Sequence, residues 1–156
     1  MSTKNLFFDN QNFEIDFLLL VPKVGLVLLE VKYYSGEVSC TDDRVWKQKN
    51  SRGVSVEHKN ASLQVLRTRA LLKKLLAAHN GCKWPIKSVV VFVHPKAVIF
   101  KAMQPNKPQT EVLTLNMLEC WIDSLPKKND IIFKQSDSNH IRSILTSAYR
   151  EYQHTA

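Results

Sequence analysis

The most informative stretch of this sequence is FEIDFLLLVPKVGLVLLEVKYYSG, residues 13–36. Residues 13–21 and 26–34 are rich in Leu, Val, Ile and Phe, a composition typical of β-strands. Pro22, Lys23 and Gly25 lie between the two segments, and these residue types indicate a tight turn. The stretch therefore predicts an antiparallel hairpin.

The outer end of this hairpin is charged. If the hairpin is symmetric about Lys23, two apolar pairs are followed by two charged pairs: Leu20 with Leu26, Leu18 with Leu28, Asp16 with Glu30, and Glu14 with Lys32. Directly opposed Cβ atoms lie about 4.5–5.5 Å apart, so Asp16 and Glu30 repel each other without a counter-charge. Lys32 supplies part of that charge, and Mg²⁺, which binds carboxylates, water and phosphate oxygens, is the other candidate.

Two carboxylates with a bound Mg²⁺ and a neighbouring lysine indicate phosphodiester hydrolysis. The metal lowers the pKa of a bound water and neutralises charge on the phosphate. The Lys32 ammonium orients that water or stabilises the pentacovalent species. A hairpin with a solvated charged end is the alternative, because chance gives roughly one acid-x-Lys triplet in a chain of this composition. Glu57-His58-Lys59 is another such triplet.

Asp16 followed by Glu30-Val31-Lys32 resembles the signature of the PD-(D/E)xK nuclease superfamily. With Gly36 and Trp46 downstream, residues 5–150 resemble the nuclease-related domain family, NERD. The resemblance implies an α/β fold, a restriction-endonuclease-like sandwich whose mixed central sheet contains an antiparallel hairpin and has flanking helices. It also implies that Mg²⁺, or Mn²⁺ in its place, binds Asp16, Glu30 and the Val31 carbonyl.

The same resemblance gives Lys32 a catalytic role and makes Gln64, on the following helix, a supporting residue of the site. The sequence departs from the family pattern before the hairpin, where the family has a helix carrying another acid. We expect that the chain begins too late to hold this helix, so either the chain is a fragment, or Glu14 substitutes for the acid, or the site is incomplete. Phe17 stands where the family usually has His, and we expect it to pack.

The net charge of +8 and the pI near 9.5 favour an anionic partner, nucleic acid before a membrane surface. Lys47, Lys49 and Arg52 surround Trp46 on an expected loop and are candidates for DNA phosphate contacts, as is Arg67 on the next helix. A solvated surface explains these side chains equally well. We expect Trp46 to belong to the core.

The remaining elements follow from periodicity. Apolar spacing predicts helices over residues 59–80 and 138–152, the first ending at Asn80-Gly81. A third helix is expected after Thr114 as its cap, before Pro126. Strands are expected at residues 6–8, 37–40, 44–48, 86–93, 98–100 and 111–115, with residues 86–93 buried on both faces.

We expect one domain over residues 1–156, in the cytoplasm. The apolar runs are too short to span a membrane, and Cys40, Cys82 and Cys120 have no disulfide or zinc spacing. Proteins of the resembled family occur mainly in bacteria, often fused to helicase or kinase modules, so a separate helicase or other DNA-processing partner is expected. The sequence leaves the oligomeric state, the DNA form and the cleavage polarity open.

Two functions therefore compete. The first is a Mg²⁺-dependent nuclease that hydrolyses DNA. The second is a catalytically inactive DNA-binding or interaction module that kept the fold, for which the absent first helix is the best support. The joint presence of Asp16, Glu30, Lys32 and Gln64 favours the nuclease.

Overall fold

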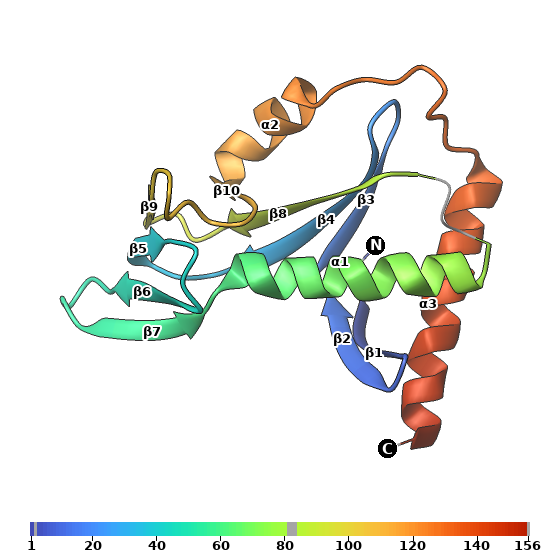
Figure 1. Cartoon of the computed structure of the whole chain (residues 1–156), viewed down its shortest axis with the longest axis horizontal. Coiled ribbons are helices and arrows are strands. Elements are labelled where there is room, and N and C mark those ends of the chain that lie inside the picture. Colours follow the sequence, from blue (N-terminus) through green and yellow to red (C-terminus); the bar gives the residue numbers. More distant parts are fainter. Residues whose placement is uncertain (2, 81–83, 156) are drawn as a thin grey trace. The chain divides into compact units, whose positions relative to one another are not determined.

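The computed structural model describes residues 1, 3–80 and 84–155 as a mixed α/β protein (Figure 1). The chain forms two compact units. Unit 1 consists of Met1–Leu29, Arg67–Lys87 and Leu125–Ala156, and unit 2 consists of Glu30–Leu66 and Ser88–Ser124. Strands β4 (Gly25–Lys32) and β8 (Ile86–Phe92) and helix α1 (Ala61–Ala78) contribute residues to both units.

Unit 1 begins with a two-stranded antiparallel sheet of β1 (Thr3–Phe8) and β2 (Gln11–Ile15). Asp9 and Asn10 join the strands with φ values of 54° and 55°, which Asp and Asn adopt more readily than other side chains. Helix α3 (Gln135–Thr155) packs against β1 (Figure 1). The predicted apolar face of α3 is confirmed by four buried side chains: Ile141, Ile144, Leu145 and Ala148.

Strand β3 (Phe17–Val21) pairs antiparallel with β4, and the predicted register is confirmed. Leu18 lies opposite Leu28 and Leu20 lies opposite Leu26. The prediction of one continuous strand over residues 13–21 is wrong, because the chain leaves the strand conformation at Asp16 and the preceding residues belong to β2. The hairpin register ends at Phe17 and Leu29, so Glu14 is not paired with Lys32 in this hairpin.

Gly25 is required at the hairpin turn. Its φ of +119° is unfavourable for any residue with a Cβ, and a Cβ there would lie 2.5 Å from the Pro85 carbonyl oxygen. That oxygen accepts a hydrogen bond of 2.9 Å from the Leu26 N–H. The turn therefore needs glycine both for its conformation and for space.

Unit 2 contains a four-stranded mixed sheet in the order β7-β6-β5-β9. Strands β5 (Gly36–Cys40), β6 (Val45–Lys49) and β7 (Ser55–Lys59) are antiparallel neighbours, and β9 (Ala97–Lys101) runs parallel to β5. The predicted ribbon of β5 and β6 is confirmed. Strand β7 was not predicted, because its side chains are mostly exposed and show no apolar alternation.

One face of this sheet is buried. Trp46 is 1% exposed, which confirms it as a core residue, and its indole Nε1–H donates to the Thr41 carbonyl at 2.8 Å. Val38 and Cys40 on β5 and Gln48 on β6 are buried with it. Three apolar or weakly polar residues and one amide therefore form the inward face.

Strand β8 is buried on both faces only from Val89 to Phe92; the prediction that the whole of residues 86–93 is buried is wrong at its start, where Lys87 is exposed. In unit 2 its parallel neighbour is β10 (Glu111–Thr114). The next strand of the sheet, on the other side of β8, is β4. A short 3₁₀ turn, η1 (Leu115–Met117), leads into α2 (Leu118–Ser124). The prediction that the Thr114 side chain caps this helix is wrong, because its hydroxyl makes no capping bond and contacts Asn116 Oδ1.

Helix α1 starts after Asn60, whose Oδ1 accepts a hydrogen bond of 3.2 Å from the Leu63 N–H. It ends at Ala78, and Asn80 follows in the left-handed conformation with a φ of 56°. Gly81, expected as part of the stop signal, lies outside the described residues. No helix in the described part of the chain is long and apolar enough to cross a membrane.

Two cysteines occupy contrasting environments. Cys40 is a buried free thiol, and burial raises its pKa from 9.0 to about 12, which the charge of Lys101 partly opposes. Cys120 on α2 is a free and exposed thiol. Cys82 lies outside the described residues.

Candidate active site at the end of strand β4

Lys32 is the last residue of strand β4, and Glu30 lies two residues before it. Because they are two residues apart on a strand, their side chains point to the same face. The Lys32 ammonium lies 2.7 Å from Glu30 Oε1, and both side chains are only 16% exposed. The lysine therefore neutralises the carboxylate in a largely desolvated position, where charge pairs interact more strongly than in water.

The strand ends near this pair lie at one edge of the sheet. The Val93 N–H donates to the Lys32 carbonyl at 3.0 Å, so the C-terminal ends of β4 and β8 are neighbours. Thr114, the last residue of β10, is paired with Phe92. In open α/β sheets, ligands bind outside the carboxyl ends of the strands. Glu30 and Lys32 thus lie at the same end of the sheet as the carboxyl ends of β8 and β10.

Gln64 is the fourth residue of α1 and is partly buried. Its Oε1 atom is buried and accepts no hydrogen bond from the described residues. The hydroxyl oxygen of Ser88 on β8, also in unit 2, is likewise buried and makes no hydrogen bond with the described residues. A buried polar atom without a partner costs about 1–3 kcal/mol, so native proteins usually supply water or an ion there.

Asp16 and Glu14, the other predicted acids, belong to unit 1. Asp16 is partly exposed and lies between β2 and β3, directly before the last registered pair of the hairpin, Phe17 with Leu29. Glu30 directly follows Leu29 in the sequence. Glu14 is exposed on β2. The structure therefore pairs Glu30 with Lys32 and places Val31 and Gln64 in the same unit, whereas the part played by Asp16 stays a prediction.

Lys47 and Lys49 lie on strand β6, so the prediction of a loop is wrong for both residues. They share the exposed face of the sheet, where Lys47 is registered opposite Glu57 and Lys49 opposite Glu37. Opposed side chains of opposite charge stabilise each other across strands. Each of these lysines therefore has an acidic neighbour, whose negative charge weakens the attraction of the lysine for a phosphate group.

The two predicted arginines have different surroundings. Arg52 is exposed in the turn between β6 and β7, where its N–H donates to Asn50 Oδ1 at 2.9 Å. Arg67 lies on α1 in unit 1 and donates from its guanidinium to Gln11 Oε1 at 3.1 Å and to the Asn12 carbonyl at 3.4 Å. Arg67 is thus partly engaged by β2, while the Arg52 side chain is exposed.

A partly buried polar network on β6 and β7 was not predicted from the sequence. The Gln48 amide donates from Nε2 to the Ser35 carbonyl at 2.6 Å, and its Oε1 lies 2.6 Å from His58 Nε2. The His58 ring stacks on Tyr34, with centroids 4.0 Å apart. Alternation along β6 was the signal available, because it places Gln48 on the same face as the buried Trp46.

The pKa of His58 lies below its usual value. Burial disfavours its charged form, and the positive charge of Lys32 adds to this effect. Both effects favour the neutral imidazole.

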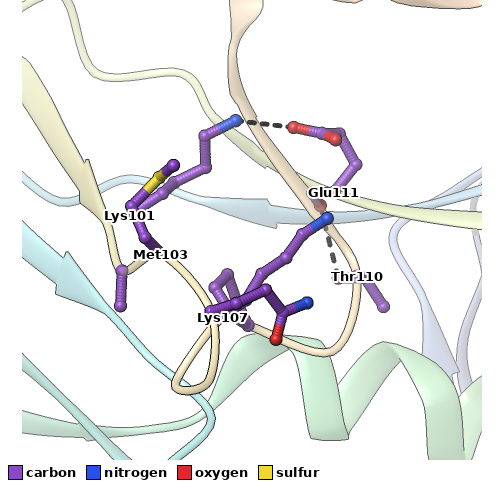
Figure 2. A pocket seen from close by; sticks show the side chains of 8 residues that line it. Lys101, Met103, Lys107, Thr110 and Glu111 are labelled. Atoms are coloured by element: carbon purple, nitrogen blue, oxygen red, sulfur yellow. Dashed lines mark hydrogen bonds and ion pairs between the residues drawn. The ribbon is translucent and has the colours of Figure 1, made fainter.

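Unit 2 also contains a pocket of about 310 Å³ between the end of β9 and the start of β10 (Figure 2). Lys101 and Glu111 form an ion pair of 2.6 Å at its rim, and the side chains of Met103 and Lys107 contribute to its lining. It includes none of the predicted catalytic residues. The candidate chemistry is therefore not located in this pocket.

The donor atoms at the end of β4 suit a hard divalent cation. No group of three or more His, Cys, Asp or Glu side chains gathers within the described ranges. Mg²⁺ needs only one or two carboxylates from the protein and keeps several waters. Glu30 offers one carboxylate to such an ion, and Gln64 Oε1 is a further oxygen acceptor in the same unit.

A mixed α/β fold with a desolvated Glu-x-Lys pair at the end of a hairpin strand defines a nuclease-like protein. The model of the nuclease-related domain family matches residues 2–93, which is more than half of the sequence. The chain belongs to this family, NERD. No curated protein and no solved structure matches the chain.

Proposed function

We propose that this protein is a metal-dependent nuclease that hydrolyses phosphodiester bonds of DNA. The observation that carries the proposal is the Glu30–Lys32 pair, held 2.7 Å apart and largely desolvated in a member of the nuclease-related family. A surface ion pair contributes little to stability, and a desolvated one often costs as much as it gains. A function for the charges therefore explains the pair better than stability does.

The proposed metal ligands are Asp16, Glu30 and the Val31 carbonyl, with Glu14 as a substitute acid. Mg²⁺ is the proposed cation and Mn²⁺ its replacement, because the ligands are hard oxygens. When bound, the cation would supply Lewis-acid chemistry at the phosphate and at water.

The other residues have roles of their own. The Lys32 ammonium donates to the attacking water or to the phosphate oxygens on which charge develops. Gln64 Oε1 accepts a hydrogen bond from that water and holds its orientation. Lys47, Lys49, Arg52 and Arg67 are proposed contacts to the DNA backbone, and a separate helicase or other DNA-processing protein is the proposed partner.

The test uses supercoiled plasmid and a labelled single strand, each with Mg²⁺, with Mn²⁺ and with EDTA. Glu30→Gln and Lys32→Met remove the two charges while keeping side-chain size. Both should lower the cleavage rate by at least about 100-fold, because each removes an interaction with the reacting groups. EDTA should abolish cleavage by the unchanged protein.

The chain itself offers matched controls in its second Glu-x-Lys triplet. Glu57→Gln and Lys59→Met make the same chemical changes on the exposed β7 and should leave the cleavage rate within about 3-fold, as expected for surface substitutions. Equal losses in both pairs of variants would refute the assigned site. Salt-sensitive DNA binding without cleavage, unchanged in Glu30→Gln, would instead establish the inactive binding module.

A further inference from the structure

Two aromatic side chains lie where strands β4 and β8 end. The Val93 N–H donates to the Lys32 carbonyl at 3.0 Å, and Tyr33 and His94 are the residues that directly follow this hydrogen bond on the two segments. Their ring centroids are 4.6 Å apart with an interplanar angle of 60°, which is an edge-to-face pair. This aromatic pair therefore begins one residue after Lys32 of the candidate site, and it belongs to the same unit.

The His94 ring is held in one orientation. Its Nδ1 accepts a hydrogen bond of 3.0 Å from the Lys96 N–H, and its backbone carbonyl accepts one of 3.0 Å from the Ala97 N–H. Because a ring nitrogen that accepts carries no proton, the proton of this ring is on Nε2. His94 is thus a fixed support for the Tyr33 ring and offers an N–H donor beside it.

Tyr33 differs from the next residue, Tyr34, in what its ring contacts. Tyr34 is partly buried, stacks on His58 with centroids 4.0 Å apart and meets Phe92 at 5.8 Å. Tyr33 is 70% exposed, although one side of it is held by His94. The Tyr34 ring is therefore part of the packing, whereas most of the Tyr33 ring is open to a ligand.

Positive charge lies beside this open ring. Lys32 precedes Tyr33 in the sequence and is paired with Glu30. Lys96 is exposed, and its carbonyl accepts a hydrogen bond of 3.0 Å from the Gly36 N–H, which keeps this residue beside the segment that follows β4. An aromatic face among cations suits a nucleic acid strand, because bases stack on the ring and phosphates pair with the cations.

The ring selects one form of nucleic acid. In a duplex both faces of each internal base are covered by neighbouring bases, so a protein ring reaches a base face where the strand is single. We propose that Tyr33, supported by His94, is a stacking platform for an unpaired base of single-stranded DNA, with Lys96 contacting a neighbouring phosphate. This inference rests on the proposed function, since it takes DNA as the substrate, and it adds the form of that DNA.

DNA binding in EDTA tests the platform without cleavage. The probes are a labelled single strand of about 12 nucleotides, a strand of equal length without bases, and the duplex of the first strand. Tyr33→Leu removes the aromatic face and keeps an apolar side chain. It should weaken binding of the single strand about 5–150-fold, which corresponds to the loss of one stacked base. Binding of the other two probes should change by less than about 2-fold, because they present no free base face.

Phe100→Leu is the matched control. Phe100 on β9 is also in unit 2 and is 53% exposed, so the same kind of ring is removed at another exposed position. This variant should bind all three probes within about 2-fold of the unchanged protein, as expected for a surface substitution.

Two results would overturn the inference. One is single-strand binding by Tyr33→Leu that equals that of the unchanged protein, above all if the free energy of unfolding falls, because the aromatic pair would then only join the ends of β4 and β8. The other is an equal loss of binding for all three probes, which would exclude stacking as the cause.

Photocrosslinking provides a second measurement that needs no variant, so it decides the matter even if Tyr33→Leu does not fold. A single strand containing 5-iodouracil crosslinks under ultraviolet light to an aromatic side chain that its base contacts. Mass spectrometry of the digested unchanged protein should find the crosslink at Tyr33. Crosslinks at other residues only would contradict the platform.

The inference and the proposed function fail separately. Metal-dependent cleavage without a Tyr33-dependent preference for the single strand retains the nuclease and removes the platform. A Tyr33-dependent preference without cleavage in Mg²⁺ or Mn²⁺ retains the platform and removes the nuclease.

Discussion

Unit 1 and unit 2 bury different kinds of side chains. In the described part of unit 1 the buried residues are apolar, with Thr68 as the buried polar exception. Unit 2 buries Gln48, Asn60 and Ser62, and it also holds the unpartnered Gln64 Oε1 and Ser88 Oγ. Unit 2 therefore adds buried polar side chains with hydrogen-bond partners to its apolar core, and only the two unpartnered atoms carry a desolvation cost.

The change occurs along a single strand. Residues Gly25 to Leu29 of β4 are buried in unit 1, and Glu30 to Lys32 are partly exposed in unit 2. Substitutions on each side of the boundary between Leu29 and Glu30 test whether the two units are stabilised differently.

Leu28→Ala should have the largest effect on stability. Leu28 is 1% exposed in the apolar hairpin, and truncating such a residue typically costs about 2–5 kcal/mol in lost burial and a new cavity. Denaturant unfolding measures the loss. Leu63→Ala on α1, where the side chain is 39% exposed, should lose less than about 1 kcal/mol. Equal losses would show that apolar burial does not dominate unit 1.

Asn60→Ala should cost about 1–3 kcal/mol in unit 2, because its amide joins three segments. Asn60 Nδ2 donates to the Asp43 carbonyl at 2.6 Å and to Gln109 Oε1 at 3.1 Å, while Oδ1 caps α1. Nδ2 also lies 3.2 Å from the Thr41 carbonyl, and Asn60→Asp keeps the cap but loses all three donations. If Asp restores full stability, the cap alone matters and the buried network contributes nothing.

Cys40 predicts a pH dependence that is confined to alkaline solution. The folded thiol has a pKa raised to about 12, whereas the unfolded thiol ionises near 9.0. Its contribution to stability is therefore complete below pH 9.0 and is lost as the pH rises from 9.0 to about 12. Cys40→Ala should show a shallower alkaline loss of unfolding free energy than the unchanged protein. Cys120→Ala, which changes an exposed thiol, should reproduce the original slope.

Lys74→Ala should have the smallest effect. Its ammonium lies 3.1 Å from Asp9 Oδ2 in unit 1, but the side chains are 62% and 51% exposed. Exposed pairs of this kind contribute about 0–1 kcal/mol and less at high salt. Denaturant unfolding of Lys74→Ala at low and high ionic strength measures the contribution of this ion pair. A loss of about 2 kcal/mol or more in the free energy of unfolding would show that ion pairs contribute substantially to the stability of unit 1.

The apolar parts of the fold could be predicted from the sequence, because they carry a strong period. The register of the β3–β4 hairpin and the face of α3 follow from spacing, and the core position of Trp46 follows from its residue type. The break at Asp16 could not be predicted, because the hairpin and β2 form one nearly continuous β-like segment in the sequence. Strand β7 was missed because tertiary pairing with β6, and not its own composition, determines its conformation.

The candidate site was predictable only where a motif existed. Glu30, Lys32 and Gln64 follow from the motif, and the structure adds the ion pair and the unpartnered oxygen. The network of His58 could not be predicted, because it depends on Gln48, ten residues away in the sequence, and on Tyr34. Contacts between residues distant in sequence leave no periodic signal.

Gly25 has a consequence for how a mutational scan of this protein should be interpreted. Every substitution there introduces a Cβ within 2.5 Å of the Pro85 carbonyl, so a screen that scores activity alone would rank position 25 with the catalytic residues. The cause is steric and lies in the folding of the hairpin. Measuring the abundance of each variant together with its activity separates folding defects from catalytic defects. Gly25 variants should be low in both abundance and activity, whereas Lys32 variants should be low in activity only.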